Sequence, residues 1–123
     1  MSNYIVDAVP NAALQYLEDN VTALHICSGD PADRAAVLTN SLGNVAVDAT
    51  DFTIANGDTS GRKSTMGQQS IASASASGTG AVACLINATV LVWRADLSAT
   101  QSITSGNPIT VNAVDVDEIR DPA

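Results

Sequence analysis

The chain has 123 residues, of which 46% are hydrophobic and only 3% are aromatic, and its formal net charge is −8 at pH 7. This length fits one domain, and the hydrophobic fraction excludes a disordered chain. Thirteen acidic side chains against five basic ones exclude nucleic acid as a partner and disfavour an anionic membrane surface. We therefore expect residues 1–123 to form a single soluble domain that binds neither nucleic acid nor membrane.

The N-terminal segment MSNYIVDAVPNAALQYL lacks the basic start and the long apolar centre of a secretory signal. No apolar run approaches the roughly 20 residues that cross a bilayer. We therefore predict synthesis in the cytoplasm, where Cys27 and Cys84 stay free thiols because the compartment is reducing. The chain has no CxxC pair and only one histidine, so we predict no zinc site and no cofactor.

An amphipathic helix is predicted over residues 8–19. Asp7 is placed at its N-cap, and Pro10 falls in the first turn, where a missing N–H is harmless. Asn20 is expected in the left-handed position that ends many helices. Apolar residues recur at three- and four-residue steps and define one face of this helix: Ala13, Leu14, Leu17 and Val21.

Short strands separated by turns are predicted after this helix. Residues 33–40 fit either a helical turn or a strand. The predicted strands are 22–28, 45–47 and 52–55, and the predicted turns are 29–31, 41–44 and 56–58.

The clearest strand signal begins at Gly61. Residues 71–77 alternate strictly, with Ala72, Ala74 and Ala76 on one face. A turn at 78–80, a central apolar strand at 81–87 and a strand at 90–97 then form a predicted antiparallel meander. Two strands complete the prediction, 101–104 and 108–119, the second with a β-bulge where the apolar set changes face. Strands at intervals of about ten residues predict a mainly β fold, an antiparallel β-sandwich or a jelly-roll-like barrel, with one N-terminal α-helix.

No catalytic constellation is visible, and we predict no catalytic residue, no metal ligand and no enzymatic activity. His25 and Cys27 share one face of a predicted strand, which leaves a Cys–His hydrolase as a formal alternative. Acidic residues in turns are expected to bond the local backbone. Three aspartates near the C-terminus form either a calcium site or solvated charges on an edge strand: Asp115, Asp117 and Asp121.

Two pairs of adjacent residues that include a basic side chain leave further alternatives open. Arg62 and Lys63 are either a docking point for an acidic partner or a solvated strand start. Trp93 either stacks with Arg94 on the surface or anchors a core that is short of aromatic side chains, and we favour the core.

Several segments, taken in order, resemble short virion structural proteins of tailed bacteriophages: LQYLEDN, LHICSGDP, SLGN, SGRK, ASGTGAVACLINATVLVWRADLS and QSITSGNPITVNAVDVDEIRDPA. The resemblance implies a capsid decoration, or cement, protein. Such a protein binds the major capsid protein of the assembled head shell as a homo-oligomer, with a trimer favoured, and is located on the capsid surface of the virion. A tail or neck component of the virion is one alternative. Another is a carbohydrate- or ligand-binding module that uses exposed aromatics, for which the candidates are Tyr4, Tyr16 and Trp93.

Contacts with neighbouring proteins are predicted at three places. The first is the apolar N-terminal segment, whose alternative role is to extend and pack on the protein's own core. The others are the alanine face of the 71–77 strand and the basic pair. The predicted contact residues are Tyr4, Ile5, Val6, Arg62, Lys63, Ala72, Ala74 and Ala76.

Overall fold

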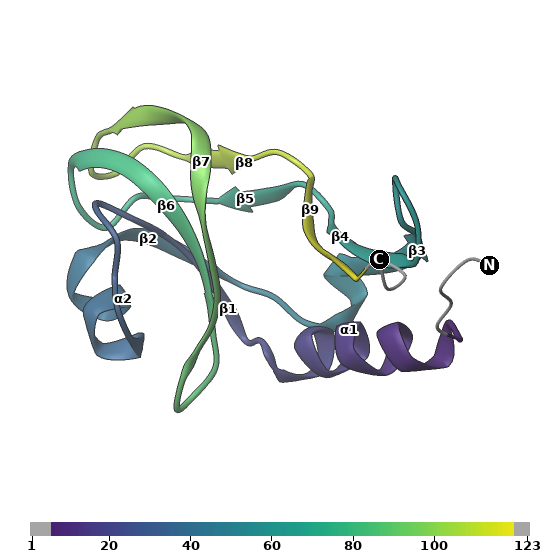
Figure 1. The fold of residues 1–123 in the computed structure, drawn as a ribbon. Coiled ribbons are helices and arrows are strands. Elements are labelled where there is room, and N and C mark those ends of the chain that lie inside the picture. The colour runs from purple at the N-terminus through teal and green to yellow at the C-terminus, as the bar shows by residue number, and fades with distance from the viewer. Residues whose placement is uncertain (1–5, 120–123) are drawn as a thin grey trace.

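The computed structural model describes residues 6–119 and shows strands arranged in antiparallel sheets (Figure 1). Strands account for 47% of the residues and helices for 21%, which confirms the prediction of a mainly β fold with an N-terminal helix. In chain order the elements are α1 (Ala8–Asn20), β1 (Ala23–Cys27), α2 (Arg34–Asn40), β2 (Ser41–Ala46), the 3-10 helix η1 (Ala49–Asp51), β3 (Phe52–Asn56), β4 (Arg62–Met66), β5 (Gln69–Ile71), β6 (Gly78–Ile86), β7 (Leu91–Ile103), β8 (Ile109–Val111) and β9 (Val114–Ile119).

Helix α1 forms where the apolar periodicity predicts it and packs against β3 and β4. Pro10 and Leu14 are buried on its inner face, and Asp7 occupies the N-cap position without a side-chain hydrogen bond. The prediction of a left-handed Asn20 is wrong, because only glycines have positive φ among residues 6–119. The Asn20 side-chain amide instead donates to the carbonyl of Tyr16, one turn earlier in the helix, at 2.7 Å.

A four-stranded sheet with the order β2-β1-β6-β7 forms the centre of the fold. The predicted central strand at 81–87 is confirmed as the body of β6, which lies between β1 and β7. Both faces of β1 and β6 are buried, so the sheet separates two cores. The larger core includes Leu24, Ile26, Ala83 and Leu85, and the smaller one includes Cys27, Val37, Val82, Cys84 and Ile86.

An interrupted antiparallel ribbon forms the second layer over the larger core. Strand β4 pairs with β9, and β5, the next strand along the chain, pairs with β8. Strand β3 adds to β4 and completes a three-stranded sheet. Figure 1 shows β5 and β8 beside the four-stranded sheet and β3, β4 and β9 farther along, toward α1. The arrangement is sandwich-like and is not a closed barrel.

In the segment from 33 to 46, the helical alternative predicted for residues 33–40 is confirmed, and the predicted turn after it is not. The first part of the segment is helix α2, whose N-cap Asp33 accepts a hydrogen bond from the Ala36 N–H at 2.8 Å. The predicted turn at 41–44 is wrong, since these residues belong to β2. Gly43 is needed there for close approach, because a Cβ atom would lie 3.1 Å from side-chain atoms of both Ile71 and Ile109.

The alternating segment 72–77 is not a strand, and β5 ends just before it at Ile71. Its backbone bonds go to two different places: the Ala74 N–H donates to the Asn107 carbonyl, and the Ser75 N–H donates to the Leu42 carbonyl. These bonds bend the segment across the end of the sheet. Strict alternation in sequence therefore does not lead to a ladder here.

The predicted turn at 78–80 is wrong, because these residues begin β6. The predicted meander is confirmed only in its second half, where the strands at 81–87 and 90–97 pair antiparallel as part of the β6–β7 hairpin. Its first strand does not join them, since β5 pairs with β8. Residues 101–103 continue β7 without a break. The predicted strand at 108–119 is divided into β8 and β9, which join different sheets where a bulge was expected.

Gly80 leaves too little room for a side chain in the larger core, and we predict that Gly80→Ala destabilises the protein. An added Cβ would lie 2.7 Å from Cδ1 of Ile103 and 3.0 Å from Cγ2 of Ile26. Overpacking of this kind costs about 1–3 kcal/mol, which urea unfolding measures. Gly67→Ala is the matched control, because its Cβ would meet only the Asp51 carbonyl at 3.7 Å. A Gly80→Ala protein as stable as the control would contradict this account of the core.

Candidate functional site

The groups best suited to chemistry lie in the smaller core, beneath α2. His25 is buried, and its Nδ1 lies 2.7 Å from the hydroxyl of Ser41. Burial lowers the pKa of His25, and the positive charge of Arg34 lowers this pKa further. The Cys27 sulfur donates instead to the Val37 carbonyl at 3.6 Å. The two side chains of the hydrolase alternative thus have separate partners, and both are buried.

Cys27 and Cys84 are close together in the smaller core. Strands β1 and β6 pair His25 with Cys84 and Cys27 with Val82, so the two cysteines are diagonal neighbours on one face. Both are free thiols with no exposed area. Their mutual hydrogen bond, together with burial, raises the pKa of Cys84, and the same hydrogen bond lowers the pKa of Cys27. The pair is therefore shielded from reagents by α2.

A buried carboxyl group joins α1 to the second layer. Glu18 is buried on the inner face of the helix, and the Ser64 hydroxyl on β4 donates to its Oε2 at 3.3 Å. Burial raises the pKa of Glu18, the hydrogen bond from Ser64 opposes this rise, and the charge of Asp19 adds to it. Glu18 thus links α1 to β4 through a buried hydrogen bond.

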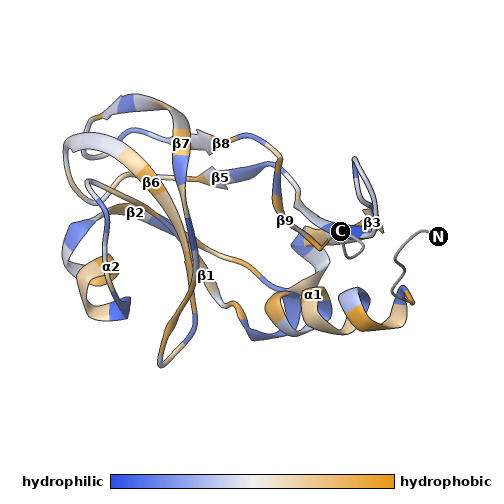
Figure 2. Ribbon diagram, in the orientation of Figure 1, coloured by the Kyte–Doolittle hydropathy of each residue, from blue (hydrophilic) through white to orange (hydrophobic). Residues whose placement is uncertain are grey.

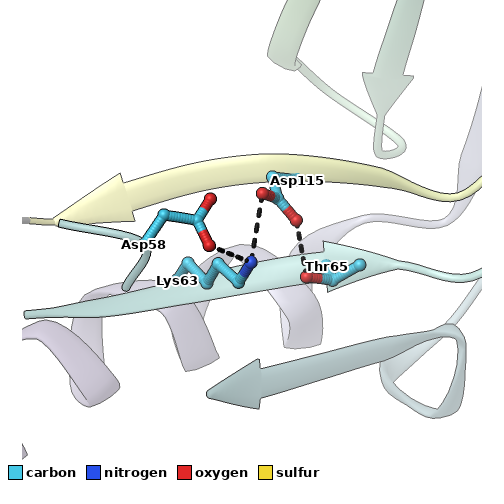
Figure 3. Close-up of polar contacts among 4 residues, drawn as sticks. All are labelled: Asp58, Lys63, Thr65 and Asp115. Atoms are coloured by element: carbon cyan, nitrogen blue, oxygen red, sulfur yellow. Dashed lines mark hydrogen bonds and ion pairs between the residues drawn. The ribbon is translucent and has the colours of Figure 1, made fainter. Parts of the chain in front are cut away.

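The predicted basic docking pair is engaged within the molecule. Arg62 donates to the side-chain oxygens of Asn11 at 2.9 Å and Asn56 at 2.7 Å. Figure 3 shows Lys63 held between Asp58 on the β3–β4 connection, at 2.7 Å, and Asp115 on β9, at 3.2 Å. The hydrogen bonds to these two carboxylates raise the pKa of Lys63. An acidic partner would have to displace these contacts.

Three of the acidic residues in turns, Asp33, Asp48 and Asp51, bond the local backbone as the sequence predicts, whereas Asp58 bonds the Lys63 side chain. Asp48 accepts from the Thr50 N–H at 2.9 Å and, with Asp51, closes a capping box around η1. The calcium alternative receives no support from Asp115, whose oxygens accept from Lys63 and from the Thr65 hydroxyl. Asp121 lies outside the described residues. The side chains of Asp117 and Glu118 are likewise not described, and among the described side chains no group of three or more His, Cys, Asp or Glu is arranged to hold a metal ion.

The other predicted contact residues are divided by the structure. Ala74 is buried in the larger core, Ala76 is half-buried, and Ala72 is exposed. The alanine face therefore does not exist as one continuous surface. Val6 is exposed, while Tyr4 and Ile5 lie outside the described residues.

A groove of about 310 Å³ lies between β7 and the β8–β9 strands, and sequence reasoning did not identify it. Strand β7 is the edge of its sheet. Every second residue from 93 to 99 lines the groove, and these residues are apolar. The Trp93 indole N–H donates to the Val116 carbonyl at 2.9 Å, which links the two walls. The apolar lining is formed mainly by Trp93, Ala95, Leu97, Ala99, Ile109 and Val111. The alternation from 93 to 99 was the available signal.

Arg94, on the other face of β7, donates to the Pro31 carbonyl. The indole of Trp93 and the guanidinium of Arg94 therefore lie on opposite faces of the strand. This arrangement agrees with the favoured prediction that Trp93 contributes to the core.

We predict that both native thiols resist a thiol-reactive disulfide reagent in the folded protein. Neither sulfur is accessible, so reaction requires opening of the smaller core. Titration should find no fast-reacting thiol under native conditions and two in guanidinium chloride. One fast-reacting thiol in the native protein would show that α2 does not cover this core.

We predict that Glu18→Gln stabilises the protein at pH 7 and has no effect at about pH 4, near the ordinary pKa of glutamate. The folded state holds the Glu18 proton more tightly than the unfolded chain does. The contribution of Glu18 is therefore complete below its unfolded pKa and is lost as pH rises through the folded pKa. Melting temperatures across this range provide the measurement.

Asp48→Asn is the control, because its effect on stability is expected to depend on pH in the opposite direction. Hydrogen bonds from the Thr50 hydroxyl and backbone lower the pKa of Asp48, so its contribution is present at pH 7 and is lost as pH falls through the folded pKa. The Asp48→Asn protein should be the less stable one at pH 7 and should approach the wild type in acid. Parallel pH profiles for all three proteins would contradict both assignments.

Within residues 6–119, no helix has both the length and the apolar character needed to cross a bilayer. Comparison with known proteins gives no match: no family model and no curated protein matches the sequence, and no solved structure matches the fold. The function therefore has to be inferred from the residues of the chain itself.

Proposed function

We propose that this protein is a structural component of a phage virion, most specifically a capsid decoration protein. It binds the major capsid protein of the assembled head shell as a homo-oligomer, with a trimer favoured, and stabilises that shell. The observation that carries the proposal is the location of two kinds of side chain, those suited to catalysis and those exposed to solvent. The side chains suited to catalysis are buried and bonded internally, while the exposed features are an apolar groove and an apolar helix face.

The groove at β7 supports docking on another protein. An edge strand presents unpaired backbone groups that can bind an extended segment of a partner, and the apolar wall beside it can accept alternate side chains. We propose that an extended segment of the capsid protein occupies this groove. Many copies of a modest contact then hold firmly, because each oligomer engages the lattice at several points.

A ligand-binding module is the second candidate, since the volume of the groove is near the low end for small-molecule sites. The aromatic side chains do not favour it. Tyr16 lies on α1 and Trp93 on β7, so they do not form one stacking platform, and Tyr4 lies outside the described residues. The Trp93 indole N–H is already bonded to Val116.

We predict that the purified protein sediments with head shells that lack it, and that Ala99→Trp weakens this binding about tenfold or more. The added indole fills the groove and excludes a partner segment. Ala88→Trp is the matched control, because Ala88 is also exposed but lies in the β6–β7 turn outside the groove. Shells prepared without the chain and mixed with each variant provide the measurement.

Failure of the wild type to bind such shells would overturn the proposal. Labelled protein found on the tail or neck in electron micrographs would support the other virion location. Equal binding by the two tryptophan variants would place the contact outside the groove.

A further inference from the structure

Helix α1 has two apolar faces, of which the fold uses only one. Pro10, Leu14 and Glu18 are buried on the inner face, against β3 and β4. The opposite side carries a second set of uncharged residues at three- and four-residue steps, which we name the outer stripe. The outer stripe consists of Val9, Ala12, Ala13 and Tyr16.

The outer stripe is open to solvent in the described structure. The Tyr16 side chain is 68% exposed and that of Val9 is 52% exposed, and Val6, just before the helix, is 50% exposed. Figure 2 shows hydrophobic colour over much of α1, which lies along the edge of the molecule. Three of the six large hydrophobic residues described as exposed therefore belong to this one region. Such clustering marks a contact surface more strongly than single exposed residues do.

The distribution of charge indicates what covers the stripe. Among the first 17 residues, Asp7 is the only charged side chain, although the chain as a whole carries −8. Elsewhere the surface is acidic, and the described basic side chains are bonded internally: Arg34 to the Asn87 carbonyl, Arg62 to Asn11 and Asn56, Lys63 to Asp58 and Asp115, and Arg94 to the Pro31 carbonyl. Two copies of this chain repel one another over most of their surface. The outer stripe itself carries no charge, and the exposed acidic residues of this region, Asp7 and Asp19, lie at the two ends of α1.

We propose that the outer stripe of α1 is the self-association face of this protein and that its occupant is the α1 helix of a second copy. The stripe suits such a contact because it has large side chains at its ends, Val9 and Tyr16, and alanines between them. The tyrosine of one helix can then lie over the alanines of the next. A basic or acidic partner would find no charge on the stripe to bind.

This inference rests on the proposed function, which requires a homo-oligomer, but its test needs no shells. Light scattering and sedimentation velocity of the full chain, at concentrations up to about 1 mM, should show a species heavier than the 12.5 kDa monomer. Val9→Glu combined with Tyr16→Glu should raise the dissociation constant at least about 100-fold. Glutamate is a good helix former, so α1 itself is retained, which circular dichroism checks.

Leu38→Glu is the matched control, because Leu38 is 48% exposed on α2, away from the stripe. It should associate as the wild type does. Added salt should strengthen association, since it screens the repulsion between acidic copies and leaves the apolar contact intact. An association that salt weakens would indicate an ionic contact and overturn the proposal.

A cross-linking experiment locates the contact directly. Ala13→Cys should link two copies through a short bismaleimide, whereas Ala35→Cys, exposed on α2, should not. Cys27 and Cys84 do not interfere because they are buried. A monomeric wild type at the highest concentration, or an Ala13→Cys protein that does not cross-link, would overturn the proposal. Self-association without binding to shells would instead remove the proposed function and leave this inference in place.

Discussion

The central sheet has to be covered on both faces, because β1 and β6 carry apolar side chains on both. Leu24 and Leu85 point to the larger core, while Cys27 and Cys84 point to the smaller one. The interrupted ribbon covers the first face and α2 covers the second. The remaining architecture follows from this need, since strands with two apolar faces are stable only when a layer lies on each side.

The layers that cover the sheet also bury the side chains best suited to catalysis, and they leave other surfaces exposed to solvent. His25 and the two cysteines are buried with β1 and β6, where they contribute packing and internal hydrogen bonds. The groove lies between β7, the edge strand of its sheet, and the β8–β9 strands of the second layer. The opposite side of α1 is not needed to cover a sheet. The proposed contacts with other proteins rest on these two apolar surfaces.

The elements predicted correctly are those whose pattern is local. Side-chain periodicity was sufficient for the helix at 8–19, and a continuous apolar run was sufficient for the strand at 81–87. The errors concern residues whose conformation is set by distant partners. Gly43 and Gly80 resemble turn glycines, but they lie in strands where side chains from β1, β5, β7 and β8 approach closely. The partners of Lys63 could not be predicted for the same reason, because Asp115 lies far along the chain.

The division of the C-terminal segment into β8 and β9 has a mechanical consequence. One short stretch of chain belongs to two different sheets, and only residues 112–113 separate its two parts. Detaching β9 from β4 pulls on β8, whose Ile109 is packed in the larger core, so the second layer cannot peel away from the centre in independent pieces. The sheets are thereby coupled into one cooperative unit, which resists partial opening when force is applied to a neighbouring contact.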